Sequence, residues 1–283
     1  NSLIAGLKAA KEKGKKHATV TDIHEEMHKL VAQEEIETFK IRFREMADSL
    51  ELWTNGIRGK LFNQIGEGFD PDADLTIIET GALTAEGSED MFAVAGLATL
   101  SNITALGEYL QYENRHIEVV IDEGHYWMIL NTLIRGLVQA TKVWRKLGIW
   151  LTFATQDFSD FPDYAKKILT QAENWILLSM EEEETQEISR FKKLTDEEHH
   201  LIRQAIIEKP NFSEATLITK RFGCGLNRFI PPSFVLALAQ TDKDEKAERK
   251  KLMREHKCSE LEVVMMIADN IQEARKSWQR ERI

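Results

Sequence analysis

The sequence is poor in several features that would identify a common class of protein. Its 283 residues contain only two cysteines, Cys224 and Cys258, which fit neither a disulfide framework nor a zinc knuckle and indicate a reducing cytosol. No run approaches the roughly 20 apolar residues of a membrane-spanning helix. Internal repeats and low-complexity linkers are also absent from the sequence. We therefore expect a cytoplasmic protein without a transmembrane segment, which reaches a membrane only through a partner.

Positive charge is also scarce, because 37 lysines and arginines oppose 47 aspartates and glutamates and leave a net charge of −10. Such a balance gives no indication of a surface that coats DNA, although a small basic channel is compatible with it. The length allows one large α/β domain with an additional subdomain. The chain begins at Asn1, without a methionine or a signal peptide, so we expect it to be part of a longer protein.

Residues 1–65 are predicted to form a helical subdomain. After Thr19, apolar residues recur at intervals of three and four, as on one face of an amphipathic helix pair. The dipeptide Asn55-Gly56 ends this pattern, because it readily adopts positive φ. The apolar positions are Val20, Ile23, Met27, Leu30, Ile36, Phe39, Phe43, Met46, Leu50 and Trp53.

Residues 66–241 have a different pattern, in which short apolar runs alternate with helical segments. This alternation is typical of buried parallel strands joined by crossover helices, so we predict a mostly parallel α/β sheet of the RecA-like or doubly wound kind. Residues 242–283 return to helix, with a capping box predicted at Ser259 and Glu262. The expected strands are 75–79, 117–121, 149–154, 175–180 and 215–219, and the expected helices lie near 90–112, 126–145, 162–172 and 182–207.

Two adjacent carboxylates follow the predicted strand 117–121. Asp122 and Glu123 would lie at the C-terminal end of a buried strand, where α/β sheets bind their ligands. In nucleotide hydrolysis, Asp122 would hold Mg²⁺ through water, and Glu123 would orient and deprotonate the attacking water. A strand that ends in an acidic turn has the same pattern, so the pair alone does not decide between the two interpretations.

The next predicted strand ends in Thr155-Gln156, a polar pair that can hydrogen-bond a terminal phosphate or its water. Two such signals in this order favour an ATPase with a RecA-like P-loop fold, whose cofactors would be ATP and Mg²⁺. Arg145 and Lys146 end the helix before this strand. Either can reach a neighbouring subunit's phosphates as an arginine finger, although the helix dipole alone also favours cations there.

The phosphate-binding loop G-x-x-x-x-G-K-[ST] is absent from the sequence. Gly14-Lys15-Lys16 lacks both the leading glycine and the hydroxyl residue. Other segments do not replace such a loop, because it cradles phosphate with backbone N–H groups. Either the loop precedes these residues in a longer protein or the ATPase is degenerate. The helices of residues 1–60 have no starting strand of their own, which favours the first interpretation.

One motif indicates a different chemistry. The segment from His24 to His28 reads H-E-E-M-H and matches the H-E-x-x-H pattern of zinc peptidases, in which two imidazoles on one helix face bind zinc. No companion motif identifies the third protein ligand that such a site needs. We therefore expect both imidazoles to face water at the edge of the apolar stripe, with no zinc between them.

Several segments together resemble a known family. In chain order they are Gly59-Lys60-Leu61-Phe62-Asn63, residues 76–83, Val120-Ile121-Asp122-Glu123, Arg145-Lys146, Ala154-Thr155-Gln156, and residues 194–198, 212–215, 227–232 and 236–243. This ordered set resembles the conjugative-transfer ATPases of type IV secretion systems, specifically their largest, VirB-class component in its TraC-like form. The likeness covers the chain from about residue 15 onward.

The resemblance implies a cytoplasmic motor that is peripheral at the inner membrane and works as a homo-oligomer, often a hexamer. Its partners would be inner-membrane components of a type IV secretion channel, and contact with DNA is a further expectation. ATP hydrolysis would power pilus assembly and the transfer of DNA or protein.

Because the phosphate loop is missing, we expect that this chain alone neither binds ATP tightly nor hydrolyses it. The resemblance nevertheless assigns roles to single residues. Two alternatives stay open, namely a degenerate ATPase that acts as an assembly or interaction module, and a zinc peptidase. The assigned residues are Asp122 and Glu123 (magnesium and water activation), Gln156 beside Thr155 (phosphate sensing), Arg145 or Lys146 (the basic motif) and Arg228 (a candidate subunit-interface arginine).

Overall fold

The computed structural model describes residues 2–66, 68–156, 158 and 161–280, and the chain divides into two compact units. The first unit contains residues 1–119 and 139–151, and the second contains residues 120–138 and 152–283. Among the described residues helices predominate, and the strands form small parallel and antiparallel sheets.

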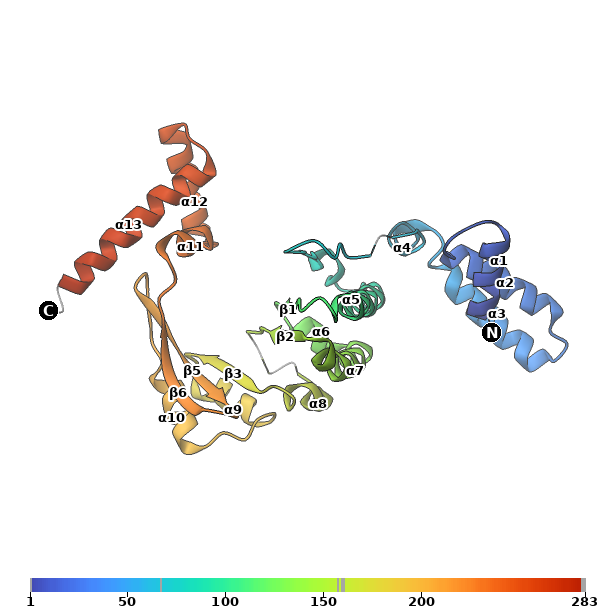
Figure 1. Cartoon of the computed structure of the whole chain (residues 1–283), viewed down its shortest axis with the longest axis horizontal. Coiled ribbons are helices and arrows are strands. Elements are labelled where there is room, and N and C mark those ends of the chain that lie inside the picture. The colour runs from blue at the N-terminus through green and yellow to red at the C-terminus, as the bar shows by residue number, and fades with distance from the viewer. Residues whose placement is uncertain (1, 67, 157, 159–160, 281–283) are drawn as a thin grey trace. The chain divides into compact units, whose positions relative to one another are not determined.

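The first unit begins with helices, as the apolar spacing predicts (Figure 1). Helix α2 packs against both α1 and α3. Gly6 allows α1 to approach α2 closely, because a Cβ atom there would lie 2.9 Å from Cγ1 of Ile23. Gly56 has a φ of +65° at the predicted break and begins α4. The bounds are α1 (Ser2–Glu12), α2 (Val20–Gln33), α3 (Glu37–Glu51) and α4 (Gly56–Phe62).

The buried face of α2 is broader than the predicted stripe. Met27 is buried as expected, but Val31 is buried in place of Leu30. The reason is that α2 lies between two helices, so burial is shared between two flanks. The other predicted stripe residues of α2, Val20 and Ile23, are half-buried, like Leu30.

Asp22 is a buried carboxylate at the start of α2, and only 1% of its side chain is exposed. Lys15 Nζ donates to Asp22 Oδ1 at 2.7 Å, and the backbone N–H of Thr19 donates to Oδ2 at 2.9 Å. The hydrogen bond from Lys15 and then that from the Thr19 backbone hold the pKa of Asp22 well below its ordinary value. The charge therefore caps the helix and ties the segment before it to α2.

Helix α5 (Glu89–Leu110) is long and apolar enough, by length and composition alone, to span a membrane. Polar residues interrupt this helix, so its sequence contains no continuous apolar run of that length. Within the first unit, Trp144 Nε1 donates to Thr104 Oγ1 at 2.8 Å, and a Cβ on Gly107 would lie 2.4 Å from Cδ1 of Ile149. One face of α5 thus packs inside this unit, through Phe92, Gly96, Leu100, Ile103, Gly107 and Leu110.

Strands β1 and β2 form the parallel pair that the sequence predicts. Ile117 N donates to Gly148 O at 3.2 Å, and Ala154 N donates to Ile121 O at 2.9 Å, so both strands run in the same direction. Helices connect them, as a parallel pairing requires. The elements are β1 (Ile117–Ile121), α6 (His125–Ile129), α7 (Asn131–Leu147) and β2 (Ile149–Phe153).

The strand expected over residues 75–79 was wrong. These residues have no strand structure, and Leu75 and Ile77 are 76% and 82% exposed. Arg115 instead holds the preceding loop, since its guanidinium donates to the carbonyl oxygens of Pro71 and Ala73. The apolar run at 75–79 therefore belongs to a loop, followed by the 3₁₀ helix η1 (Gly81–Leu83).

The strands predicted near 175–180 and 215–219 are present but wrong in direction, because they belong to an antiparallel sheet around β5, whose other two strands, β4 and β6, were not predicted. Residues 220–222 join β5 to β6, and a turn of that length permits only antiparallel pairing. Strand β3 pairs with the other side of β5, with Leu178 opposite Ala215 and Asn174 opposite Thr219. The strands are β3 (Asn174–Leu178), β4 (Ile207–Glu208), β5 (Phe212–Thr219) and β6 (Gly223–Phe229).

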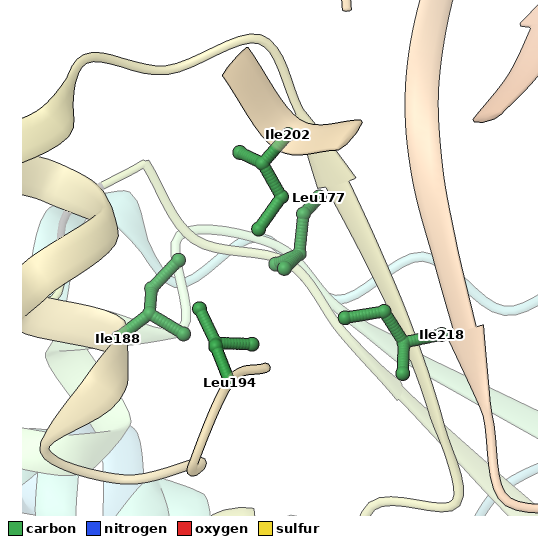
Figure 2. Close-up of a cluster of buried hydrophobic side chains, with 5 residues drawn as sticks. All are labelled: Leu177, Ile188, Leu194, Ile202 and Ile218. Carbon is green, nitrogen blue, oxygen red and sulfur yellow. The ribbon is translucent and has the colours of Figure 1, made fainter. Parts of the chain in front are cut away.

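Helices cover this antiparallel sheet, and one apolar cluster joins them to it. Figure 2 shows the cluster, whose side chains come from the two strands, from two helices and from the segment that connects these helices. Residues 162–172 and 182–207, each expected to be one helix, contain η2 (Asp163–Ala165), α8 (Lys166–Leu169), α9 (Glu182–Ser189) and α10 (Asp196–Gln204). The cluster consists of Leu177, Ile188, Leu194, Ile202 and Ile218.

The C-terminal segment is helical, as predicted. The capping box at its last helix is present, since Ser259 N donates to Glu262 Oε2 at 2.8 Å and Glu262 N donates to Ser259 Oγ at 3.4 Å. An apolar cluster of Ala237, Val264, Ala268 and Ile271 packs α13 against α11, a helix that precedes the predicted tail. The helices are α11 (Ser233–Leu238), α12 (Lys243–His256) and α13 (Glu260–Arg280).

Candidate functional site

The ends of β1 and β2 are joined by backbone hydrogen bonds within the second unit. Ala154 N donates to Ile121 O at 2.9 Å, and Gly124 N donates back to Ala154 O at 2.8 Å. These two bonds hold the turn after β1 against the end of β2. They bring together the carboxylate pair and the polar pair that the sequence singles out, namely Asp122 with Glu123 and Thr155 with Gln156.

The carboxylate of Glu123 is contacted from two directions. Gln156 Nε2 donates to Glu123 Oε1 at 2.7 Å, and His125 Nδ1 lies 3.4 Å from Glu123 Oε2. The Glu123 side chain is still 42% exposed, so water can reach it. Asp122 is also exposed, and its Oδ1 accepts the backbone N–H of Glu123 at 2.9 Å.

The backbone of Glu123 has an unusual conformation. Its φ is +49°, in the left-handed region that non-glycine residues adopt at a cost of about 1 kcal/mol or more. Such strained residues concentrate at functional sites, where the surrounding structure holds them. Here the surrounding bonds are those that Gly124 and Ala154 make across the turn.

Gly124 and His125 are site residues that sequence reasoning missed. A Cβ on Gly124 would lie 2.1 Å from Cε1 of Phe153, so only glycine allows the turn to approach β2 this closely. The signal was the glycine itself, which directly follows the two carboxylates. His125 gave no separate signal, because its contact with Glu123 depends on the shape of the turn.

The donor atoms at this turn fit Mg²⁺ bound to a nucleotide. The described residues contain no group of three or more histidine, cysteine, aspartate or glutamate side chains that would hold a metal without other ligands. Mg²⁺ commonly takes one or two carboxylates together with water and substrate phosphates, so a protein cage is not required. Asp122, exposed at the end of β1, is suited to hold Mg²⁺ through water.

The predicted basic residues lie elsewhere in the chain. Arg145 and Lys146 are exposed in the last turn of α7 and belong to the first unit. Arg228 lies on β6 in the second unit, where its Nη2 donates to Glu214 Oε1 at 2.6 Å and its guanidinium lies 3.8 Å from the centre of the Phe212 ring. Arg228 therefore has an ion-pair partner within the sheet.

His24 and His28 lie close together on α2. Their Nε2 atoms are 3.0 Å apart, with His28 exposed and His24 half-buried rather than fully open to water as expected. The glutamate of the motif, Glu25, accepts a hydrogen bond from Lys13 at 2.6 Å, and this bond lowers its pKa. That pairing engages the carboxylate that a peptidase would use as its base.

Comparison with known proteins gives a match in structure but not in sequence. No family model matches the chain, and no curated protein matches it. A solved structure of VirB4 of Thermoanaerobacter pseudethanolicus is similar, with a TM-score of 0.55 and 16% sequence identity. The match covers 87% of this chain and 64% of that structure, so the chain spans less than two thirds of its length. The predicted resemblance to VirB-class proteins is therefore confirmed at the level of the fold, and the chain has a VirB4-like fold.

Proposed function

We propose that this chain forms the magnesium- and water-binding part of the ATPase motor of a conjugative type IV secretion system. The observation that carries the proposal is the hydrogen bond between Glu123 and Gln156 at the joined ends of two parallel strands. It links a carboxylate able to activate water to an amide able to bind the terminal phosphate. The VirB4-like fold supports the same proposal.

In this mechanism Glu123 orients the attacking water and accepts its proton, while the Gln156 amide holds the carboxylate and contacts the terminal phosphate. Thr155 lies beside Gln156 and adds a hydroxyl for the phosphate or its water. Mg²⁺, held by Asp122 through water, would neutralise charge that develops on the phosphates. Arg145 or Lys146 of a neighbouring subunit would supply a further cation to the same charge.

The sequence has no glycine-rich phosphate loop, so these 283 residues lack the backbone N–H groups that would grip phosphate. We therefore propose that the active protein contains such a loop, and that it assembles as a hexamer with inner-membrane components of the secretion channel on the cytoplasmic side. The same proposal includes that this assembly powers pilus assembly and substrate transfer and that it contacts DNA. A degenerate ATPase that acts only in assembly is the second candidate, and the absent loop is the observation in its favour.

The test is the Glu123→Gln variant of the complete protein, compared with wild type by ATP turnover and by calorimetric binding of Mg-ATP. We expect turnover to fall by at least about 10²-fold while binding persists, since only the base and water-orienting function is lost. Near wild-type turnover would remove Glu123 from the mechanism. The 283-residue chain alone should neither bind Mg-ATP tightly nor hydrolyse it, and micromolar binding to it would contradict the proposed division of the site.

A further inference from the structure

His125 is the first residue of α6 and is not used by the mechanism above. Its Nδ1 is buried and has no hydrogen-bond partner among the residues that the structure describes. Buried polar atoms in native proteins almost always have a partner, because they lose their bonds to water. A buried ring nitrogen that lacks one is therefore expected to have a polar partner close by.

The atom that faces this nitrogen is Glu123 Oε2, at 3.4 Å. A neutral imidazole carries one N–H group, and with the proton on Nδ1 the ring can donate to this carboxylate oxygen. At 3.4 Å the two atoms are close, but they lie just beyond the ordinary range of a well-formed hydrogen bond. The ring of Tyr126 lies 4.1 Å from the imidazole centre and confines the ring on another side.

The backbone around His125 is fixed independently of the side chain. Gly124 N is bonded to Ala154 O at 2.8 Å, and Met128 N donates to Gly124 O at 3.2 Å, which anchors the start of α6. These backbone bonds fix the point from which the imidazole side chain extends. Gln156, in contrast, reaches the other carboxylate oxygen from the end of β2.

We propose that His125 is a positioning residue for Glu123. Its role in turnover rests on the proposed function, whereas the contact between the two side chains does not. The imidazole holds Oε2 while the Gln156 amide holds Oε1, so the two contacts fix the plane of the carboxylate. A general base must be aligned with the proton it accepts, and a misplacement of about 1 Å can cost about 10²-fold in rate. His125 thus orients the base without touching the substrate.

The contact is tested first without nucleotide, in the 283-residue chain, by the ¹⁵N chemical shifts of histidine side chains. We expect His125 to carry its proton on Nδ1 and to lose this preference in Glu123→Ala, which removes the acceptor. The sequence has eight histidines, and the other seven serve as internal controls that should not change. A His125 proton on Nε2 in both proteins would overturn the proposal.

Turnover of the complete protein then separates positioning from packing. The amide nitrogen of asparagine can take the position of Nδ1, whereas that of glutamine takes the position of Nε2. We expect His125→Ala to lower kcat by about 10- to 100-fold with little change in KM, His125→Asn to recover most of the rate, and His125→Gln to recover little. Equal rates for the three variants would contradict the proposal. An inactive wild type would defeat the proposed function alone, because the ¹⁵N shifts still decide whether the contact exists.

Discussion

The second unit holds two glutamates in opposite ways. Glu214, on the central strand β5, has a side chain that is only 9% exposed, with Arg228 on Oε1 and the backbone N–H of Ile206 on Oε2. Glu123, after β1, is 42% exposed, has a φ of +49° and accepts a hydrogen bond from Gln156 at 2.7 Å. The fully paired carboxylate of Glu214 stabilises the fold, whereas the strained and open carboxylate of Glu123 remains available for chemistry.

The largest change in stability is expected from Arg228→Ala. It leaves Glu214 buried without its cation, which we expect to cost about 2–3 kcal/mol in the free energy of unfolding, less than for a fully buried pair because the Arg228 side chain is 49% exposed. Arg221→Ala is the matched control, since Arg221 is exposed beside Phe222, and it should cost less than about 0.5 kcal/mol. Denaturant unfolding measures both. Unchanged stability with a lost oligomer would instead support the subunit-interface role suggested by the sequence.

The second expected effect concerns the buried cap of α2. Asp22→Asn removes the charge that Lys15 pairs with, and we expect a loss of about 1–2 kcal/mol at neutral pH. The folded pKa of Asp22 lies below its ordinary value of 3.8, so its contribution is present above that pH and is lost as the pH falls through the folded pKa. The wild type should therefore lose more stability than the variant between pH 5 and pH 2, by about the same amount.

Asp48→Asn is the control for this titration, because Asp48 is exposed on α3. It should leave both the stability and its pH dependence unchanged within about 0.5 kcal/mol. If Asp22→Asn keeps the acid dependence of the wild type, the Asp22 cap is not its source.

The smallest effect is a gain. Glu123→Gly relieves the left-handed backbone at the turn, because glycine adopts positive φ without the steric cost, and we expect the unfolding free energy to rise by up to about 1 kcal/mol. Changes of opposite sign in Glu123→Gly and Arg228→Ala would confirm that the two glutamates have different roles. A destabilised Glu123→Gly variant would show instead that Glu123 supports the fold as Glu214 does.

The sequence predicted β1 and β2 because short apolar runs separated by helices are typical of parallel strands with crossover helices. The predicted direction of β5 was wrong for a physical reason. The residues of this strand are buried or half-buried on both faces, as in a central parallel strand, although its neighbours are antiparallel. The direction is instead determined by the short turn before Gly223, which composition alone does not reveal.

The geometry of the site could not be predicted from the sequence for a similar reason. The adjacency of Asp122 and Glu123 in the sequence predicts two carboxylates at a strand end. It does not predict that the backbone of Glu123 is in the left-handed region or that His125 lies close to its carboxylate. Both features follow from the bonds between Gly124 and Ala154, which join segments 30 positions apart. Local patterns identify the chemical groups, and the tertiary contacts orient them.

We propose above all that Glu123 activates the attacking water. The most direct measurement is an experimental structure of the complete protein with Mg²⁺, ADP and aluminium fluoride, which imitate the transferred phosphoryl group and its leaving nucleotide. We predict a water in line with the aluminium, within about 2.6–3.2 Å of the Glu123 carboxylate, and Asp122 in contact with the water shell of Mg²⁺. A nucleotide bound away from this turn, or a water held by another side chain while Glu123 points elsewhere, would contradict the account.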